Sequence, residues 1–295
     1  MASERLGREE LNLLMTQIRP RLHRYCARMV GSVFDGEDIV QEALAKAAEA
    51  LPSAGTIEKA ERWLFTIAHN TALDALRRRK RKAEVPLEGD SPLGPEQPAE
   101  ADSWIAASAS LATIMQLPII QRSTVVLMDV LGYSLAETVD ILGTTLPAVK
   151  AALHRGRVRL KAMSGTASAE TQQPELAADE RSRLRSYADS FNARDFDTLR
   201  NLLAEDVKLE VVNRIRLAGR KDVSVYFTRY SETSDWRFAV GIAEGRPALL
   251  VSDPQGASDA VVYVVLLEWA DGRIAGIRDF RHAKYVADGL AVTRL

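Results

Sequence analysis

Side chains that could contact nucleic acid gather between Ser134 and Arg159, in SLAETVDILGTTLPAVKAALHRGRVR. Ser134 and Glu137 have the spacing of a capping box at a helix start, and Gly143 is typical of a helix end. A second helix then begins after Thr145. Its polar and basic side chains could meet phosphates and base edges: Thr145, Lys150, His154, Arg155 and Arg157. The pattern predicts a helix-turn-helix on duplex DNA, and a solvated basic face of an ordinary helical hairpin is the alternative.

A second basic element lies at residues 61–82, ERWLFTIAHNTALDALRRRKRK. Its apolar positions recur at helical spacing, and it ends in six consecutive basic residues, 77–82, which a phosphate backbone would neutralise. Trp63, His69 and Asn70 could stack on unpaired bases or form hydrogen bonds with them. The alternatives are a core position for Trp63 and a solvated linker for the basic run.

An acidic element precedes it, at residues 35–50, DGEDIVQEALAKAAEA. Ile39, Ala43 and Ala47 form an apolar stripe, and the opposite face is acidic and polar. Such a face is suited to a basic protein partner rather than to nucleic acid.

The order of these three elements resembles that of bacterial sigma factors of the extracytoplasmic-function class. The resemblance covers about residues 10–163 and rests on DGEDIVQEAL, on RWLFTIAHNTALDALRRRKR and on the helix-turn-helix. It implies an all-α N-terminal half with two helical sigma domains. Region 2 would occupy residues 8–82, an acidic linker 83–103, and region 4, with the helix-turn-helix, 104–163.

The resemblance also implies a role for each matching residue. Three would hold the clamp helices of the RNA polymerase β′ subunit: Asp38, Gln41 and Glu42. Six would open and read the −10 promoter element: Arg62, Trp63, His69, Asn70, Arg77 and Arg78. The basic residues of the helix-turn-helix would lie in the major groove of the −35 element, and the polymerase β flap is a further expected partner. The recognition helix starts with Pro147-Ala148-Val149 instead of the small polar residues common in this class, so we expect it to use phosphates, thymine methyl groups and DNA shape.

The last third of the chain changes its period after a second linker at 164–175. Helical patterns begin near Leu176 and at Phe196, and another covers 221–231. Alternating patterns predict strands at 207–212, 236–243, 247–252, 260–270 and 273–283, with Asp271-Gly272 as a hairpin turn. This order predicts an α+β domain over 176–295 with a curved sheet.

The domain resembles the SnoaL-like class, related to ketosteroid isomerase, in which a cone-shaped sheet often encloses a pocket. Candidate lining residues are Tyr187, Tyr226, Trp236, Trp269 and His282, with Asp206 and Asp279 as acids that could transfer a proton. Regulation by contact with the DNA-binding regions requires only a weak interaction, because tethering gives the domain a high effective concentration near them. Catalysis would require an arranged set of reactive groups. We therefore expect no catalytic residues.

The composition of the chain argues against several other classes of protein. The 295 residues carry a net charge of −1, so the basic surfaces are local. Cys26 is the only cysteine, which argues against a disulfide framework and a cysteine-rich zinc site. No segment reads as a signal peptide or membrane span, so a cytoplasmic protein is expected, without membrane association, metal or cofactor.

Together these features predict a sigma factor that binds RNA polymerase core and promoter DNA. Its C-terminal domain would modulate activity, with or without a small ligand, and a separate anti-sigma factor would not be required. Two alternatives stay open: a stand-alone helix-turn-helix regulator, and a sigma factor fused to a ligand-binding or isomerase-like enzymatic domain.

Overall fold

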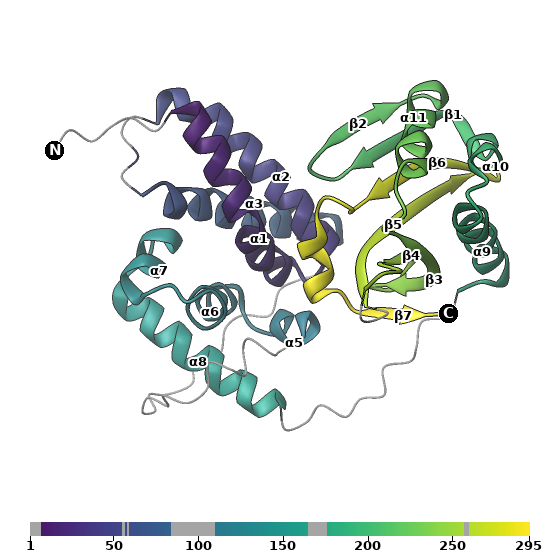
Figure 1. The fold of residues 1–295 in the computed structure, drawn as a ribbon. Helices are drawn as coiled ribbons and strands as arrows, with labels where there is room; N and C mark the ends of the chain where they lie inside the picture. Colours follow the sequence, from purple (N-terminus) through teal and green to yellow (C-terminus); the bar gives the residue numbers. More distant parts are fainter. Residues whose placement is uncertain (1–6, 55–56, 58, 84–109, 165–175, 257–259) are drawn as a thin grey trace. The chain divides into compact units, whose positions relative to one another are not determined.

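The computed structural model describes residues 7–54, 57, 59–83, 110–164, 176–256 and 260–295 (Figure 1). The chain divides into two compact units, residues 1–169 and 170–295. Beyond their first residues, the two predicted linkers lie outside the described residues.

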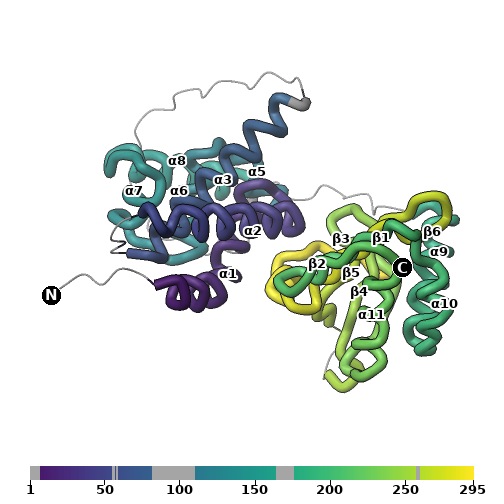
Figure 2. Tube along the Cα trace, turned by 90° about the horizontal axis from the view of Figure 1, so that it is seen from above, coloured from purple at the N-terminus to yellow at the C-terminus, as the bar shows by residue number. Residues whose placement is uncertain are grey.

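The N-terminal unit is helical throughout its described part. Its first half contains α1 (Arg8–Val30), α2 (Val33–Ala50), the short helix η1 (Leu51–Ser53) and α3 (Ala60–Ala83). Its second half contains α5 (Leu111–Met115), α6 (Ile119–Val125), the π-helical turn η2 (Val126–Val130), α7 (Leu135–Leu142) and α8 (Leu146–Ser164). Figure 2 shows α2 and α3 side by side, in agreement with their direct contacts.

Local sequence fixes the ends of the helix-turn-helix. The Ser134 hydroxyl accepts from the Glu137 backbone N–H, and the Glu137 carboxylate accepts from the Ser134 N–H, which completes the predicted capping box. Gly143 ends α7 with a φ of 59°, a left-handed conformation that costs glycine little. Thr145 then accepts from the Ala148 N–H at the start of α8.

One hydrophobic core joins both halves of the N-terminal unit. It buries side chains of α1, α2 and α3 together with five from the second half: Ile114, Val126, Leu127, Tyr133 and Ile141. Arg122 of α6 is buried as well and donates to the Met29 carbonyl of α1 at 2.6 Å. The two halves therefore form one packed body.

The C-terminal unit combines helices with one curved sheet. The helices are α9 (Ala178–Asn192), α10 (Phe196–Asn201), α11 (Arg220–Ser231) and the short η3 (Lys284–Gly289). The strands are β1 (Leu203–Val211), β2 (Ile215–Ala218), β3 (Arg237–Ala243), β4 (Arg246–Ser252), β5 (Val261–Ala270), β6 (Arg273–Asp279) and β7 (Val292–Arg294).

The sheet has the order β2-β1-β6-β5-β4-β3-β7 within the described residues, and β1 and β6 are its parallel pair. Asp271 and Gly272 form the β5–β6 turn with φ angles of 50° and 74°, as the sequence predicts. An aromatic core packs α9 against β3, where the rings of Phe191 and Phe238 stack at 4.1 Å. The α+β prediction is confirmed, although β2 and β7 were not expected.

Candidate functional site

The predicted −35 side chains lie on or beside α8. Thr145 and Lys150 are exposed, and His154 and Arg155 are half-buried. Arg157 instead forms a two-pronged contact with Asp129 of η2, with Nε to Oδ2 at 2.9 Å and Nη2 to Oδ1 at 2.6 Å. The Asp129 side chain is 2% exposed, so Arg157 neutralises a buried charge and connects α8 to η2.

The predicted −10 side chains lie on α3 in several different settings. Trp63 packs against the shared core, and Asn70 is exposed. His69 is buried, with its Nδ1 2.7 Å from the Tyr25 hydroxyl. Burial and, to a smaller extent, the Arg77 guanidinium lower the pKa of the His69 imidazole to about 4, so this side chain is neutral at pH 7.

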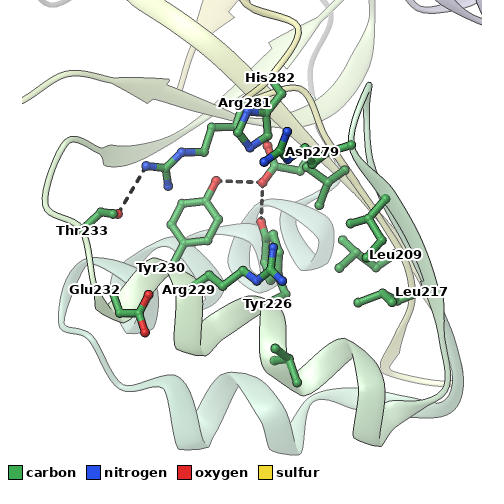
Figure 3. Close-up of a pocket in the computed structure, with 14 residues that line it drawn as sticks. Leu209, Leu217, Tyr226, Arg229, Tyr230, Glu232, Thr233, Asp279, Arg281 and His282 are labelled. Carbon is green, nitrogen blue, oxygen red and sulfur yellow. Dashed lines mark hydrogen bonds between the residues drawn. The ribbon is translucent and has the colours of Figure 1, made fainter.

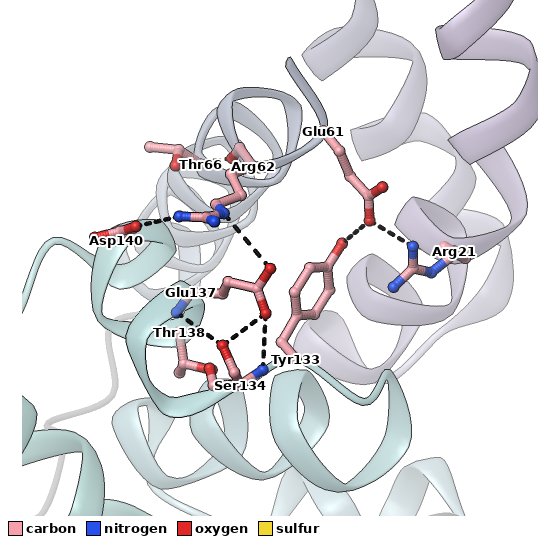
Figure 4. Close-up of polar contacts among 9 residues, drawn as sticks. All are labelled: Arg21, Glu61, Arg62, Thr66, Tyr133, Ser134, Glu137, Thr138 and Asp140. Atoms are coloured by element: carbon pink, nitrogen blue, oxygen red, sulfur yellow. Dashed lines mark hydrogen bonds and ion pairs between the residues drawn. The ribbon is translucent and has the colours of Figure 1, made fainter. Parts of the chain in front are cut away.

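Arg62 belongs to a set of contacts between α3 and the second half of the unit (Figure 4). Arg62 pairs with Asp140 of α7, and its Nε lies 3.6 Å from the Glu137 carboxylate. Beside it, Glu61 accepts from both Arg21 of α1 and the Tyr133 hydroxyl. We name the set Arg21, Glu61, Arg62, Tyr133, Glu137 and Asp140 the region 2–4 clasp.

The acidic face of α2 carries the predicted polymerase contacts. Asp38 is exposed, and Gln41 and Glu42 are half-buried. Glu42 pairs with Lys46 at 2.7 Å and with Arg78 at 3.2 Å, and these cations lower the pKa of its carboxyl group. A predicted polymerase-binding residue and a predicted DNA-binding residue thus contact each other.

In the C-terminal unit, a cavity of about 410 Å³ lies between α11 and strands β1, β2 and β6 (Figure 3). At its floor Asp279 is 1% exposed and accepts from the hydroxyls of Tyr226 at 2.9 Å and Tyr230 at 2.7 Å. The Arg281 N–H donates to the other carboxylate oxygen at 2.8 Å. Burial raises the pKa of Asp279, and these three hydrogen bonds oppose the shift.

The structure brings only some of the predicted pocket residues together. Tyr226 and His282 line this cavity, and so does Asp279. Tyr187 is buried elsewhere in the core, Trp236 packs edge-on against Phe191 at 5.1 Å, and Trp269 lies under the Arg183 guanidinium. Asp206 is exposed on β1. None of these four lines the cavity.

Sequence reasoning missed several lining residues. Tyr230 stands one helical turn after Tyr226, and this spacing places both on one face of a helix. That signal was available in the sequence. Arg214 comes from the β1–β2 turn, Arg229 from α11 and Arg281 from the turn after β6, and no local pattern links them. Among the described residues no His, Cys, Asp and Glu cluster could hold a metal ion. None of the described helices is both long and apolar enough to span a membrane.

Comparisons with known proteins match this architecture. Residues 14–82 match Sigma-70 region 2, residues 111–160 match Sigma-70 region 4, and residues 184–277 match the SnoaL-like domain. The fold and its motifs thus define a sigma-70-type factor with a SnoaL-like extension.

Sequence similarity to known proteins identifies the family of the chain. The chain is 34% identical to the ECF RNA polymerase sigma factor SigM of Mycobacterium tuberculosis over 145 residues, which cover 49% of this chain and 72% of SigM. It is 29% identical to SigG of the same organism over 218 residues, and there the match spans 59% of SigG. The solved structure of M. tuberculosis SigJ shares 19% identity, with 94% of this chain and 99% of SigJ covered and a TM-score of 0.36. The chain belongs to the extracytoplasmic-function family of RNA polymerase sigma factors.

Proposed function

We propose that this protein binds RNA polymerase core and directs it to promoters through region 2 and region 4. The observation that carries the proposal is the presence of both regions in the order of the family, with distinct charged surfaces. Lys150 on α8 and Asn70 on α3 are exposed toward solvent, where nucleic acid can reach them. Asp38 on α2 offers a separate acidic contact for a protein partner.

Promoter binding requires the two regions to separate. The −10 and −35 elements are about 25 base pairs apart, which is about 85 Å along B-form DNA. Two regions that share one hydrophobic core cannot reach both elements at once. The chain between Ala83 and Ser110 is long enough for separation, since an extended residue spans about 3.4 Å. The packed form is therefore a resting form of the factor.

The C-terminal domain modulates this opening and needs no catalytic activity to do so. Because it is tethered to region 4, even a weak contact has a high effective concentration. The regulation is built into the chain, so a separate anti-sigma factor is not required.

Co-purification with polymerase core tests the proposal. Replacing Asp38, Gln41 and Glu42 with alanine should abolish association, because the acidic face of α2 is lost. The control is Glu49→Ala, which removes an exposed carboxylate from the same helix. Unchanged association of the triple variant would contradict the proposed contact, and DNA binding without any core binding would favour a stand-alone regulator.

A further inference from the structure

The cavity of the C-terminal unit has the features of a ligand site that the sigma factor activity does not use. Its volume of about 410 Å³ lies in the range of small-molecule sites. It opens beside α11, and Figure 3 shows Tyr226 and Tyr230 of that helix pointing toward Asp279, with Leu209 and Leu217 on the opposite wall.

The floor of the cavity is polar, but its polar atoms already have hydrogen-bond partners within the protein. Tyr226, Tyr230 and the Arg281 N–H all donate to Asp279, and the Tyr230 hydroxyl lies 3.1 Å from that of Tyr263. These side chains are almost fully buried, so their polar atoms bond one another and expose little to the cavity. The floor does not demand a polar group from a ligand.

The wall and rim are apolar and partly open. Leu209, Val211 and Leu217 come from β1 and β2, and Ile215 and Val225 stand at the rim. Ile215 is 37% exposed and Val225 is 49% exposed, although both are large hydrophobic residues. Covering these side chains would be favourable, at about 25 cal/mol for each Å² removed from water.

Cationic side chains surround the same opening. Arg214 and Arg229 line the cavity and are exposed, and neither has a carboxylate partner among the described residues. Arg281 is different, because it pairs with Asp235 at 2.7 Å. Glu232 is the one exposed carboxylate among the lining residues. A guanidinium group binds a carboxylate or phosphate in a two-pronged geometry, so two unpaired guanidinium groups favour an anion.

We propose that this cavity binds an amphipathic organic anion, with its apolar body against Leu209, Leu217 and Val225 and its acid group at Arg214 and Arg229. The proposal does not depend on polymerase binding, and its test uses no polymerase.

Isothermal titration of the full chain with three ten-carbon probes tests the proposal. The probes are decanoate, decanol and decyltrimethylammonium, which share an apolar tail and differ in head-group charge. Decanoate should bind saturably at one site, and the neutral and cationic probes should bind about tenfold more weakly or worse. Equal affinity for decanoate and decanol, or no saturable decanoate binding, would overturn the proposal.

Variants locate the head group. Arg214→Gln with Arg229→Gln should raise the decanoate Kd about tenfold or more, because both guanidinium groups are removed. The matched control is Arg185→Gln, which removes an exposed arginine on α9 away from the cavity. Circular dichroism should show both proteins folded, since all three arginines are exposed. An unchanged Kd in the double variant would contradict the proposed site.

A charge reversal gives an independent check. Val225→Glu places a carboxylate at the rim on an exposed helical position, where the fold tolerates it. This variant should weaken decanoate binding and strengthen decyltrimethylammonium binding. If both probes keep their affinities, binding occurs elsewhere and the proposal is wrong.

Discussion

Arg62 of α3 pairs with Asp140 of α7, so a side chain expected to read the −10 element is held by the helix-turn-helix (Figure 4). The Arg62 side chain is partly buried, and Glu137 approaches it from the same helix. Such partly exposed pairs are worth at most about 1 kcal/mol, so the shared hydrophobic core contributes more to the packed form. The ion pair positions the two regions, and removing one of its charges should shift the equilibrium between the packed and the separated form.

Loss of the Asp140 charge should favour separation of the regions. In Asp140→Asn, we expect the separated population to rise about twofold to fivefold, the equivalent of up to about 1 kcal/mol. The population is measured by single-molecule energy transfer between dyes on cysteines introduced at Ala45 and Val158, which are both exposed.

The matched control is Asp74→Asn, since Asp74 pairs with Arg77 within α3 at 3.0 Å and lies outside the clasp. An equal shift in both variants would mean that net charge, and not the clasp, controls the separation.

Arg157 should prove to be a stabilising residue. In Arg157→Gln, Asp129 stays buried without its cation, which should lower the free energy of unfolding by about 3 kcal/mol. Urea unfolding followed by circular dichroism measures this loss. A stability change below about 0.5 kcal/mol would show that the pair contributes little.

Lys150 should show the opposite behaviour, because it is exposed. Lys150→Gln should leave the urea midpoint unchanged and weaken promoter binding, with the log–log salt dependence reduced by about 0.9. Fluorescence anisotropy with a promoter duplex at several salt concentrations measures both quantities. An unchanged salt dependence would mean that Lys150 does not contact a phosphate.

His69 should make the N-terminal unit sensitive to acid. Its pKa is about 4 in the folded state, below the ordinary value of 6.5, so the unfolded chain binds the proton more readily. The contribution of His69 to the free energy of unfolding is therefore fully present above pH 6.5 and is lost as the pH falls toward 4. The total loss is about 3 kcal/mol. Urea unfolding of the full chain at pH 7 and pH 4.5 checks this loss.

The variant His69→Gln isolates this contribution from other acid-sensitive groups. It should lose less stability than the native chain between these two pH values, because glutamine does not titrate. Parallel losses in both proteins would show that His69 is not responsible.

The sequence alone predicted the structure correctly where the signals were local. The capping box at Ser134 and Glu137 and the left-handed Gly143 define α7, because each depends on residues within one or two helical turns. The short strand β2 was missed, since Ile215–Ala218 has only four residues, at the lower limit for recognising an alternating pattern.

The sequence alone did not predict the role of a residue where tertiary contacts determine that role. Arg157 fits a basic helical face equally well whether it meets DNA or a carboxylate, and its partner Asp129 lies 28 residues away. Trp236 was a candidate to line the pocket. In the structure its ring packs in the aromatic core and its indole N–H donates to Thr233 at 3.1 Å.

Run-off transcription with purified polymerase core tests the sigma factor assignment most directly. On a promoter library, the full chain should yield transcripts with defined start sites, and the triple variant at Asp38, Gln41 and Glu42 should yield none. A chain ending at Ala169, the end of the N-terminal unit, should start at the same sites with altered yield, since the C-terminal domain is absent. The absence of transcripts from the full chain, together with absence of core binding, would contradict the account.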